Sequence, residues 1–95
     1  MRPVFVFGCD RSGTTFLGSL LGSHSRCVAT PESQFVYQDP SRYHREGAFD
    51  VAAAVSRIKE NFRFRLWNLD LQAEAARAQG VASYGELVAF IAQTY

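Results

Sequence analysis

The chain has 95 residues, of which 47% are hydrophobic and 20% charged, a composition typical of one ordinary globular domain. Ten Lys and Arg residues against nine Asp and Glu residues give a net charge of +1, so bulk attraction to nucleic acid or to a membrane surface is not indicated. No apolar run approaches the roughly 20 residues that a membrane-spanning helix needs. Because a strand is expected to begin at residue 4, which leaves no room for a signal peptide, we expect a cytoplasmic location.

The first predicted element is a short strand over residues 4–7, followed by a glycine-bounded turn and the start of a helix. Its residues are all β-branched or aromatic, which is typical of a strand covered on both faces in a parallel sheet. Gly8 and Gly13 frame four residues, and Thr14 and Thr15 then open the helix. This spacing is the P-loop frame G-x-x-x-x-G, with Thr14 where nucleotide hydrolases carry lysine.

The groups in this turn favour an anion. A tight connection from strand to helix directs backbone N–H groups inward, and the helix N-terminus adds about half a positive charge. Gly8 can adopt a positive φ, Gly13 lets a ligand approach the backbone, and Arg11 supplies a planar cation suited to phosphate or sulfate oxygens. The hydroxyl donors beside them are Ser12, Thr14 and Thr15. The alternative is an ordinary connection whose hydroxyls only cap the helix, but the coincidence of strand, spacing, arginine and hydroxyls favours an anion site.

The first helix is predicted over residues 13–22, and a second short strand over residues 27–29. The expected apolar face of that helix consists of Phe16, Leu17, Leu20 and Leu21. A right-handed crossover makes the two strands parallel, so the second strand ends at the same sheet edge as the glycine-bounded turn. Glu32 follows at this edge, where it is either a general base for an incoming nucleophile or a structural acceptor for nearby N–H groups.

The second half of the chain predicts helices and no further strand. Asp50 is placed to cap a helix that continues to Asn61, and residues 70–79 form an alanine-rich helix that ends at a glycine. Ser83 and Glu86 have the spacing of a capping box that opens a last helix. The expected apolar faces of the first and last of these helices are Val51, Ala54, Val55 and Ile58, and Leu87, Val88, Phe90 and Ile91.

Two segments between these helices are predicted to be non-helical. Residues 36–48 are polar and read as an irregular loop. Residues 62–67 alternate between apolar and basic side chains and predict a short extended segment. We expect Phe62, Phe64 and Trp67 to pack in the core, which is favoured over the stacking of nucleic-acid bases on these rings.

Residues 3–25, PVFVFGCDRSGTTFLGSLLGSHS, resemble the N-terminal signature of the sulfotransferases that use 3′-phosphoadenosine-5′-phosphosulfate (PAPS), in particular the bacterial group related to tyrosylprotein sulfotransferases. The matching residues are Arg11-Ser12-Gly13-Thr14-Thr15, then Leu17, Leu20, Leu21 and His24, and then Pro31-Glu32. The resemblance is dense over residues 3–36 and looser over residues 64–70 and 84–90. Asp10 departs from the pattern, because relatives often have proline there.

The resemblance implies a fold and a set of roles. It implies that Arg11 contacts the transferring sulfonate and that Glu32 deprotonates an acceptor hydroxyl. The residues it implies for the 5′-phosphate of PAPS lie in the loop that begins at Gly8, and they are Ser12, Gly13, Thr14 and Thr15. No metal-ligand cluster is visible in the sequence, and the acceptor is not identified. The alternatives are a P-loop kinase or nucleotide hydrolase, and a non-catalytic module that binds phosphate.

A single pair of parallel strands rarely stands alone, so the domain is expected to be incomplete. We expect an α/β fold with a P-loop-like parallel sheet, of which residues 1–95 form the N-terminal part. Residues 1–36 would be the donor-binding βαβ unit and residues 37–95 a loop and helical segment. The family's residues for the 3′-phosphate of PAPS would follow residue 95, so the 95 residues alone are expected to be inactive.

Overall fold

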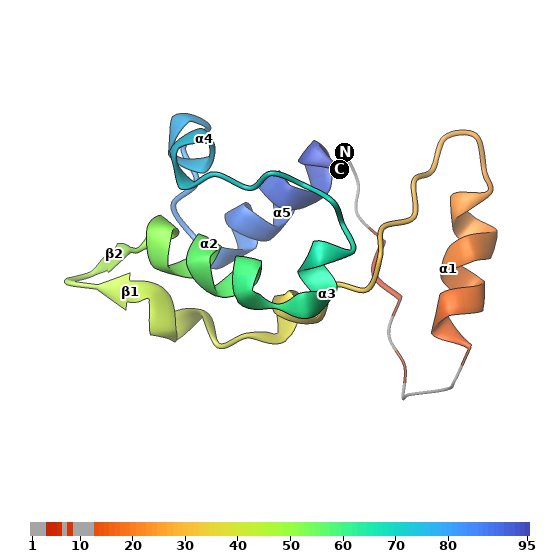
Figure 1. The fold of residues 1–95 in the computed structure, drawn as a ribbon, viewed down its shortest axis with the longest axis horizontal. Coiled ribbons are helices and arrows are strands. Elements are labelled where there is room, and N and C mark those ends of the chain that lie inside the picture. The colour runs from red at the N-terminus through yellow and green to blue at the C-terminus, as the bar shows by residue number, and fades with distance from the viewer. Residues whose placement is uncertain (1–3, 7, 9–12) are drawn as a thin grey trace.

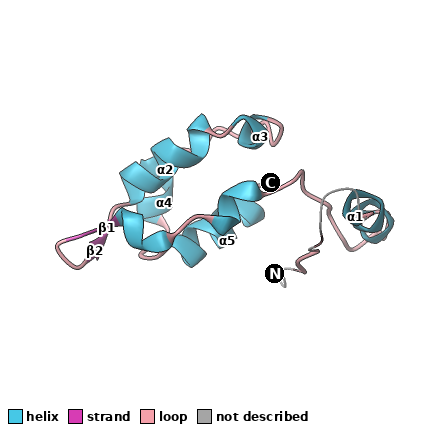
Figure 2. Cartoon of the chain, turned by 90° about the horizontal axis from the view of Figure 1, so that it is seen from below, coloured by secondary structure: helices cyan, strands magenta, loops and turns pink. Residues whose placement is uncertain are grey.

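The computed structural model describes residues 4–6, 8 and 13–95, and its helices form one cluster with a single helix set apart. The elements, in chain order, are α1 (Thr14–Gly22), the 3₁₀ turns η1 (Gln34–Tyr37) and η2 (Pro40–Tyr43), β1 (His44–Arg45), β2 (Ala48–Phe49), α2 (Val51–Glu60), α3 (Phe62–Arg65), α4 (Ala73–Ala78) and α5 (Tyr84–Thr94). Figure 1 shows α2, α3, α4 and α5 gathered together, with α1 at the opposite end of the molecule. The same separation is visible from below in Figure 2.

The caps predicted for α2 and α5 are present. The Asp50 carboxylate accepts a hydrogen bond from the backbone N–H of Ala53 at 3.0 Å, and Ser83 Oγ accepts one from the N–H of Glu86 at 3.1 Å. These side chains satisfy backbone donors that have no partner within the helix, so both helices begin where the sequence places them. The apolar face predicted for α2 is buried in full: Val51, Ala54, Val55 and Ile58.

The core is centred on Phe35, which is 1% exposed. Its ring packs edge-on against Phe64 and Trp67, with centroid distances of 5.6 Å and 5.4 Å. The hydroxyl of Tyr84 donates a hydrogen bond to the carbonyl of Phe35, which ties the first turn of α5 to η1. Leu87, which is fully buried, adds a second layer from α5. One cluster of aromatic and aliphatic side chains therefore joins η1, α3 and α5.

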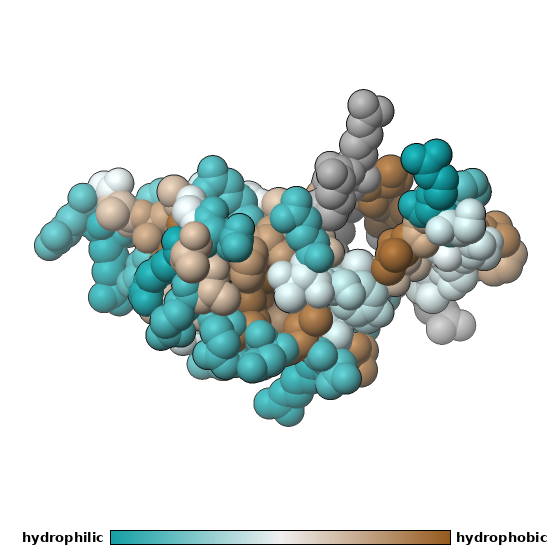
Figure 3. Space-filling view, turned by 90° about the horizontal axis from the view of Figure 1, so that it is seen from above, coloured by the Kyte–Doolittle hydropathy of each residue, from teal (hydrophilic) through white to brown (hydrophobic). Residues whose placement is uncertain are grey.

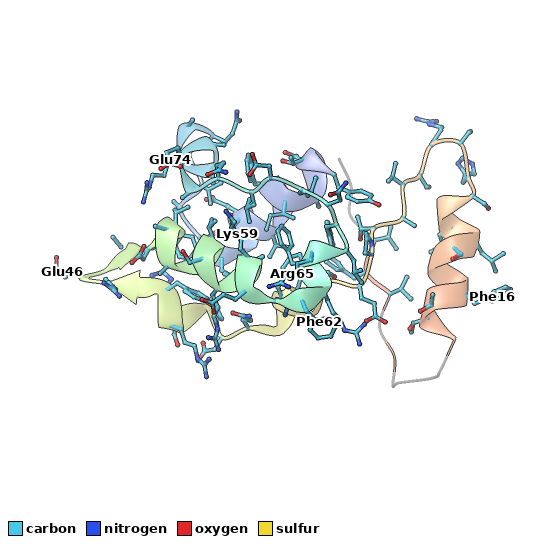
Figure 4. The ribbon with its side chains drawn as sticks, in the orientation of Figure 1. Phe16, Glu46, Lys59, Phe62, Arg65 and Glu74 are labelled. Atoms are coloured by element: carbon cyan, nitrogen blue, oxygen red, sulfur yellow. The ribbon has the colours of Figure 1, made fainter. Side chains whose placement is uncertain are left out.

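The extended segment predicted over residues 62–67 is wrong, because Phe62–Arg65 forms α3. Asn61 Oδ1 accepts a hydrogen bond from the N–H of Arg63 at 2.9 Å, and this cap starts a helical turn in place of a strand. Helical spacing puts Phe64 and Trp67 on the buried face but leaves Phe62 65% exposed. Figure 4 shows Phe62 at the surface of α3, so its predicted core role is also wrong.

The expected parallel sheet is not formed by the residues that the structure describes. Residues 4–6 and 27–29 lie in no strand, and residue 7 of the predicted first strand lies outside the described residues. Parallel strands are stable in sheets that are covered on both faces, whereas Val4 and Val28 are 77% and 78% exposed.

The sheet that the described residues do form is a small antiparallel hairpin in the predicted loop over 36–48. Its strands β1 and β2 pair His44 with Phe49 and Arg45 with Ala48. Between them, Glu46 and Gly47 both have a positive φ, 53° and 79°, which is the backbone of a two-residue hairpin turn. Because this segment is mostly polar, its sequence does not show the apolar alternation that would predict a hairpin.

Helix α1 matches its predicted range closely, but its apolar face has no cover in the described part of the molecule. No residue of α1 is buried. The exposed apolar side chains are Phe16, Leu17, Leu20 and Leu21. Figure 3 shows apolar surface at this end of the molecule, and in Figure 4 Phe16 lies on the side of α1 that faces away from the helical cluster.

The C-terminal end of α1 does have a neighbour. A Cβ added at Gly22 would lie 2.5 Å from the Cβ of Ala29, so the chain after α1 returns close against the end of the helix.

None of the described helices is both long and apolar enough to cross a membrane.

The contrast between the two apolar faces predicts unequal costs of truncation. Leu87→Ala removes a fully buried side chain and should lower the free energy of unfolding by about 2–5 kcal/mol. Leu20→Ala, at a position that is 54% exposed, should change it by less than about 1 kcal/mol. Urea titrations followed through the fluorescence of the single tryptophan, Trp67, measure both values. Equal losses in the two variants would contradict this description of the core.

The core tyrosine predicts a loss of stability in alkali. Burial, with a smaller contribution from the neighbouring Tyr43, raises the pKa of Tyr84 to about 12 from its usual 10. Because the folded state holds the proton more tightly, its advantage is complete below pH 10 and is lost as the pH rises from 10 to 12. Urea titrations across this range should show a smaller decline for Tyr84→Phe than for the wild type. An identical decline would refute the assignment to Tyr84.

Candidate functional site

The glycine-bounded turn leads into α1 through Gly13, which has a φ of +93°. This left-handed backbone is the one that favours glycine, so the residue that the P-loop spacing singles out is also required by the local geometry. The carbonyl of Gly13 accepts a hydrogen bond from the N–H of Leu17 at 3.0 Å, which closes the first turn of the helix. The predicted helix start is confirmed within one residue.

The start of α1 is open in the way that an anion site needs. Among the described residues, none accepts a hydrogen bond from the backbone N–H groups of Thr14 or Thr15, and the first turn contains no acidic residue. A Cβ placed at Gly13 would meet no described atom within 4 Å. Unpaired N–H groups, the positive end of the helix dipole and free space together suit a phosphate or sulfate group.

The remaining residues predicted for this loop are described only in part. Gly8 is exposed. Arg11 and Ser12, predicted as the sulfonate contact and a phosphate ligand, lie outside the described residues, as does Asp10. Their roles therefore stay predictions. In the described part of the chain no group of three or more His, Cys, Asp or Glu side chains could hold a metal ion.

Glu32 is held by the segment that begins with α3. Its Oε2 forms an ion pair with Arg63 Nη1 at 2.5 Å. Its backbone carbonyl accepts a hydrogen bond from Trp67 Nε1 at 3.1 Å. The carboxylate is 53% exposed, and Oε1 has no hydrogen-bond partner among the described residues, so one carboxylate oxygen is free to face a ligand.

Arg63 is a site residue that the sequence analysis missed. It lies four residues before Trp67, and helical spacing brings the two side chains to the same side of the chain, where both reach Glu32. A signal was present, since a helical reading of residues 62–67 places an arginine and a tryptophan on one face. An extended segment also puts residues 63 and 67 on one face, but about 13 Å apart, so only the helical turn brings the two side chains close together.

The two parts of the predicted site are not joined by the described residues. No hydrogen bond or ion pair connects Glu32 with Thr14 or Thr15 in the part of the chain that the structure describes. The sheet edge that was expected to bring them together is not formed there either. In Figure 1, α1 stands apart from α3, whose Arg63 forms the ion pair with Glu32.

The conformation of Gly13 predicts a position-specific effect on anion binding. Gly13→Ala forces an alanine into left-handed backbone at a cost of about 1 kcal/mol or more, and should weaken binding at the start of α1 roughly fivefold or more. Gly18→Ala, in the middle of the same helix and in open space, is the matched control and should leave binding unchanged. Phosphate titration, observed through the amide resonances of Thr14 and Thr15, measures both variants. Equal affinities would contradict a role for this turn.

Comparison with known proteins identifies one family. The sulfotransferase family matches residues 3–94, which is nearly the whole chain. No curated protein and no solved structure matches the chain. The matched segment contains the predicted glycine-bounded turn, α1, Glu32 and the two residues that hold Glu32, Arg63 of α3 and Trp67. The chain therefore belongs to the sulfotransferase family.

Proposed function

We propose that this protein transfers a sulfonate group from PAPS to an acceptor hydroxyl. The observation that carries the proposal is the sulfotransferase family match over residues 3–94, which includes the predicted glycine-bounded turn and the start of α1, where no described side chain caps the helix. Family membership supports sulfonyl transfer as the kind of reaction. We further propose that PAPS is the donor and that the acceptor group is a hydroxyl. The proposal also includes a relation to bacterial sulfotransferases of the tyrosylprotein type.

The start of α1 is proposed to hold the donor. Ser12 and Gly13 would bind the 5′-phosphate with backbone and hydroxyl donors, and Thr14 and Thr15 would add N–H groups of the first helical turn that have no acceptor among the described residues. Gly8 would allow the tight turn that starts the loop. A phosphosulfate carries fewer negative charges than a triphosphate, which needs a lysine and Mg²⁺ more, so a threonine in place of the P-loop lysine suits this donor.

Arg11 and Glu32 are the proposed catalytic residues. When bound, the donor supplies an activated sulfonate attached to a phosphate leaving group. Arg11 would stabilise negative charge at the bridging oxygen with its guanidinium group. Glu32 would accept the proton of the acceptor hydroxyl on Oε1, the oxygen that the ion pair with Arg63 does not use.

We also propose that further strands complete a P-loop-like parallel sheet, with residues 4–7 and 27–29 as two of its strands. The support is the uncovered face of α1, where Phe16 and Leu20 are 69% and 54% exposed. An apolar helix face of this kind normally packs against a sheet or another helix. Residues 1–36 would then be the donor-binding unit and residues 37–95 the loop and helical segment of one larger domain. The cytoplasmic location stays a prediction from the sequence.

A transfer assay tests the proposed function. The full-length protein, incubated with ³⁵S-labelled PAPS and a panel of tyrosine peptides, sugars, lipids and small alcohols, should label at least one acceptor. Arg11→Ala should abolish transfer, and Glu32→Gln should lower kcat by about 10²–10⁴-fold. Arg26→Ala, which removes an exposed arginine beyond the end of α1, is the control and should transfer at the wild-type rate.

Three outcomes would overturn parts of this proposal. Turnover of ATP with Mg²⁺, without binding of adenosine 3′,5′-bisphosphate, would indicate a kinase or nucleotide hydrolase. Bisphosphate binding without transfer to any acceptor would indicate a non-catalytic phosphate-binding module. An active protein that is indifferent to Glu32→Gln would remove the base assignment and leave the family assignment intact.

A further inference from the structure

We propose that Arg63 is a positioning residue for the base, and that it acts with Trp67 to hold Glu32 with one carboxylate oxygen free for the acceptor. This inference rests on the proposed function, because it assigns Arg63 a role in the same transfer reaction. It adds two residues from the helical half of the chain to a site that otherwise depends on the first 32 residues.

Glu32 is held at two points that serve different purposes. Trp67 donates its indole N–H to the backbone carbonyl of Glu32 at 3.1 Å, which fixes the position of the main chain. Arg63 Nη1 binds Oε2 at 2.5 Å, which fixes the direction of the side chain. A glutamate on an exposed segment otherwise samples many rotamers, so fixing both ends selects one arrangement of the free oxygen Oε1.

The two holding residues are themselves anchored. Trp67 is 4% exposed and packs against Phe35 and Phe64 in the core. Arg63 belongs to α3, which Asn61 caps, and its guanidinium carbon lies 5.2 Å from the centre of the neighbouring Phe62 ring. Both groups that hold Glu32 therefore belong to the helical cluster, and Trp67 is part of its core.

Fold stability is a poor explanation for this ion pair. The Arg63 and Glu32 side chains are 34% and 53% exposed, and ion pairs this accessible contribute about 1 kcal/mol or less. Within the described residues, Arg63 Nε is buried without a hydrogen-bond partner, which is an unfavourable arrangement. An ion pair that adds little stability, and whose arginine has a nitrogen without a partner among the described residues, is better explained by a role in orienting the Glu32 carboxylate.

A general base works only when it lies within hydrogen-bond reach of the proton it accepts. A small error in the position of a reacting group can lower the rate by about a hundredfold. Loss of Arg63 would free the Glu32 carboxylate to rotate, while the donor site at the start of α1 would be unaffected. The expected signature is therefore a fall in kcat with unchanged donor affinity.

Variants of the full-length protein test this role. Arg63→Met keeps the length of the side chain without its charge, and should lower kcat by roughly 10–100-fold. Arg63→Lys keeps a cation within reach of Oε2 and should recover most of the activity. Arg65→Met, which removes an exposed arginine from the same helix, is the matched control and should behave as the wild type. Trp67→Phe keeps an aromatic ring in the core but removes the indole donor, and should lower kcat severalfold.

Three further measurements separate positioning from a structural role. The Kd for adenosine 3′,5′-bisphosphate should be the same in Arg63→Met and in the wild type. Added guanidinium ion at millimolar concentration should partly restore transfer by Arg63→Ala, in which it can occupy the vacated site beside Glu32. It should not restore Glu32→Gln. The double variant Glu32→Gln/Arg63→Met should be no slower than Glu32→Gln alone, because positioning has no value without the base.

The outcomes distinguish the two levels of the proposal. If the wild type transfers sulfonate in a Glu32-dependent manner and Arg63→Met matches its kcat, this inference is overturned and the proposed function stands. The inference also fails if Arg63→Met loses bisphosphate affinity in proportion to kcat, or if guanidinium gives no rescue of Arg63→Ala. If the wild type transfers sulfonate to no acceptor, the proposed function falls and this inference falls with it.

Discussion

The packing of Phe35 is the constraint on which the rest of the described structure depends. Its ring packs against Phe64 and Trp67, and its carbonyl accepts a hydrogen bond from the hydroxyl of Tyr84. One residue thus joins a 3₁₀ turn, a four-residue helix and the start of α5, none of which buries enough surface to be stable alone. Glu32 lies three residues before Phe35, so the same packing brings it to α3.

Much of the helical half could be predicted from the sequence, because its signals are local. Asp50 and Ser83 cap their helices with hydrogen bonds to residues three positions ahead, and α2 buries the four residues that its period selects. The short elements were not predictable in the same way. The two-residue strands of the hairpin are set by the positive φ of Glu46 and Gly47, and although glycine favours that backbone, glutamate is not typical of it.

The candidate site shows the same division between local and long-range information. Gly13 at the start of α1 could be found from spacing, and the structure gives it the left-handed backbone that requires glycine. Glu32 could be found from its place after a predicted strand. Its ion pair with Arg63 spans 31 positions and depends on whether residues 62–67 form a strand or a helix. Reading these six residues as extended separated Arg63 from Trp67 along the chain, and so did not reveal the partner of the proposed base.

The close approach of Gly22 to Ala29 ties the end of α1 to the segment that carries Glu32. The two touch at a point where two Cβ atoms do not fit. A side chain at position 22 requires the backbone around position 29 to move away, and that backbone leads within three residues to Glu32. The glycine at the end of α1 therefore bears on the position of the proposed base.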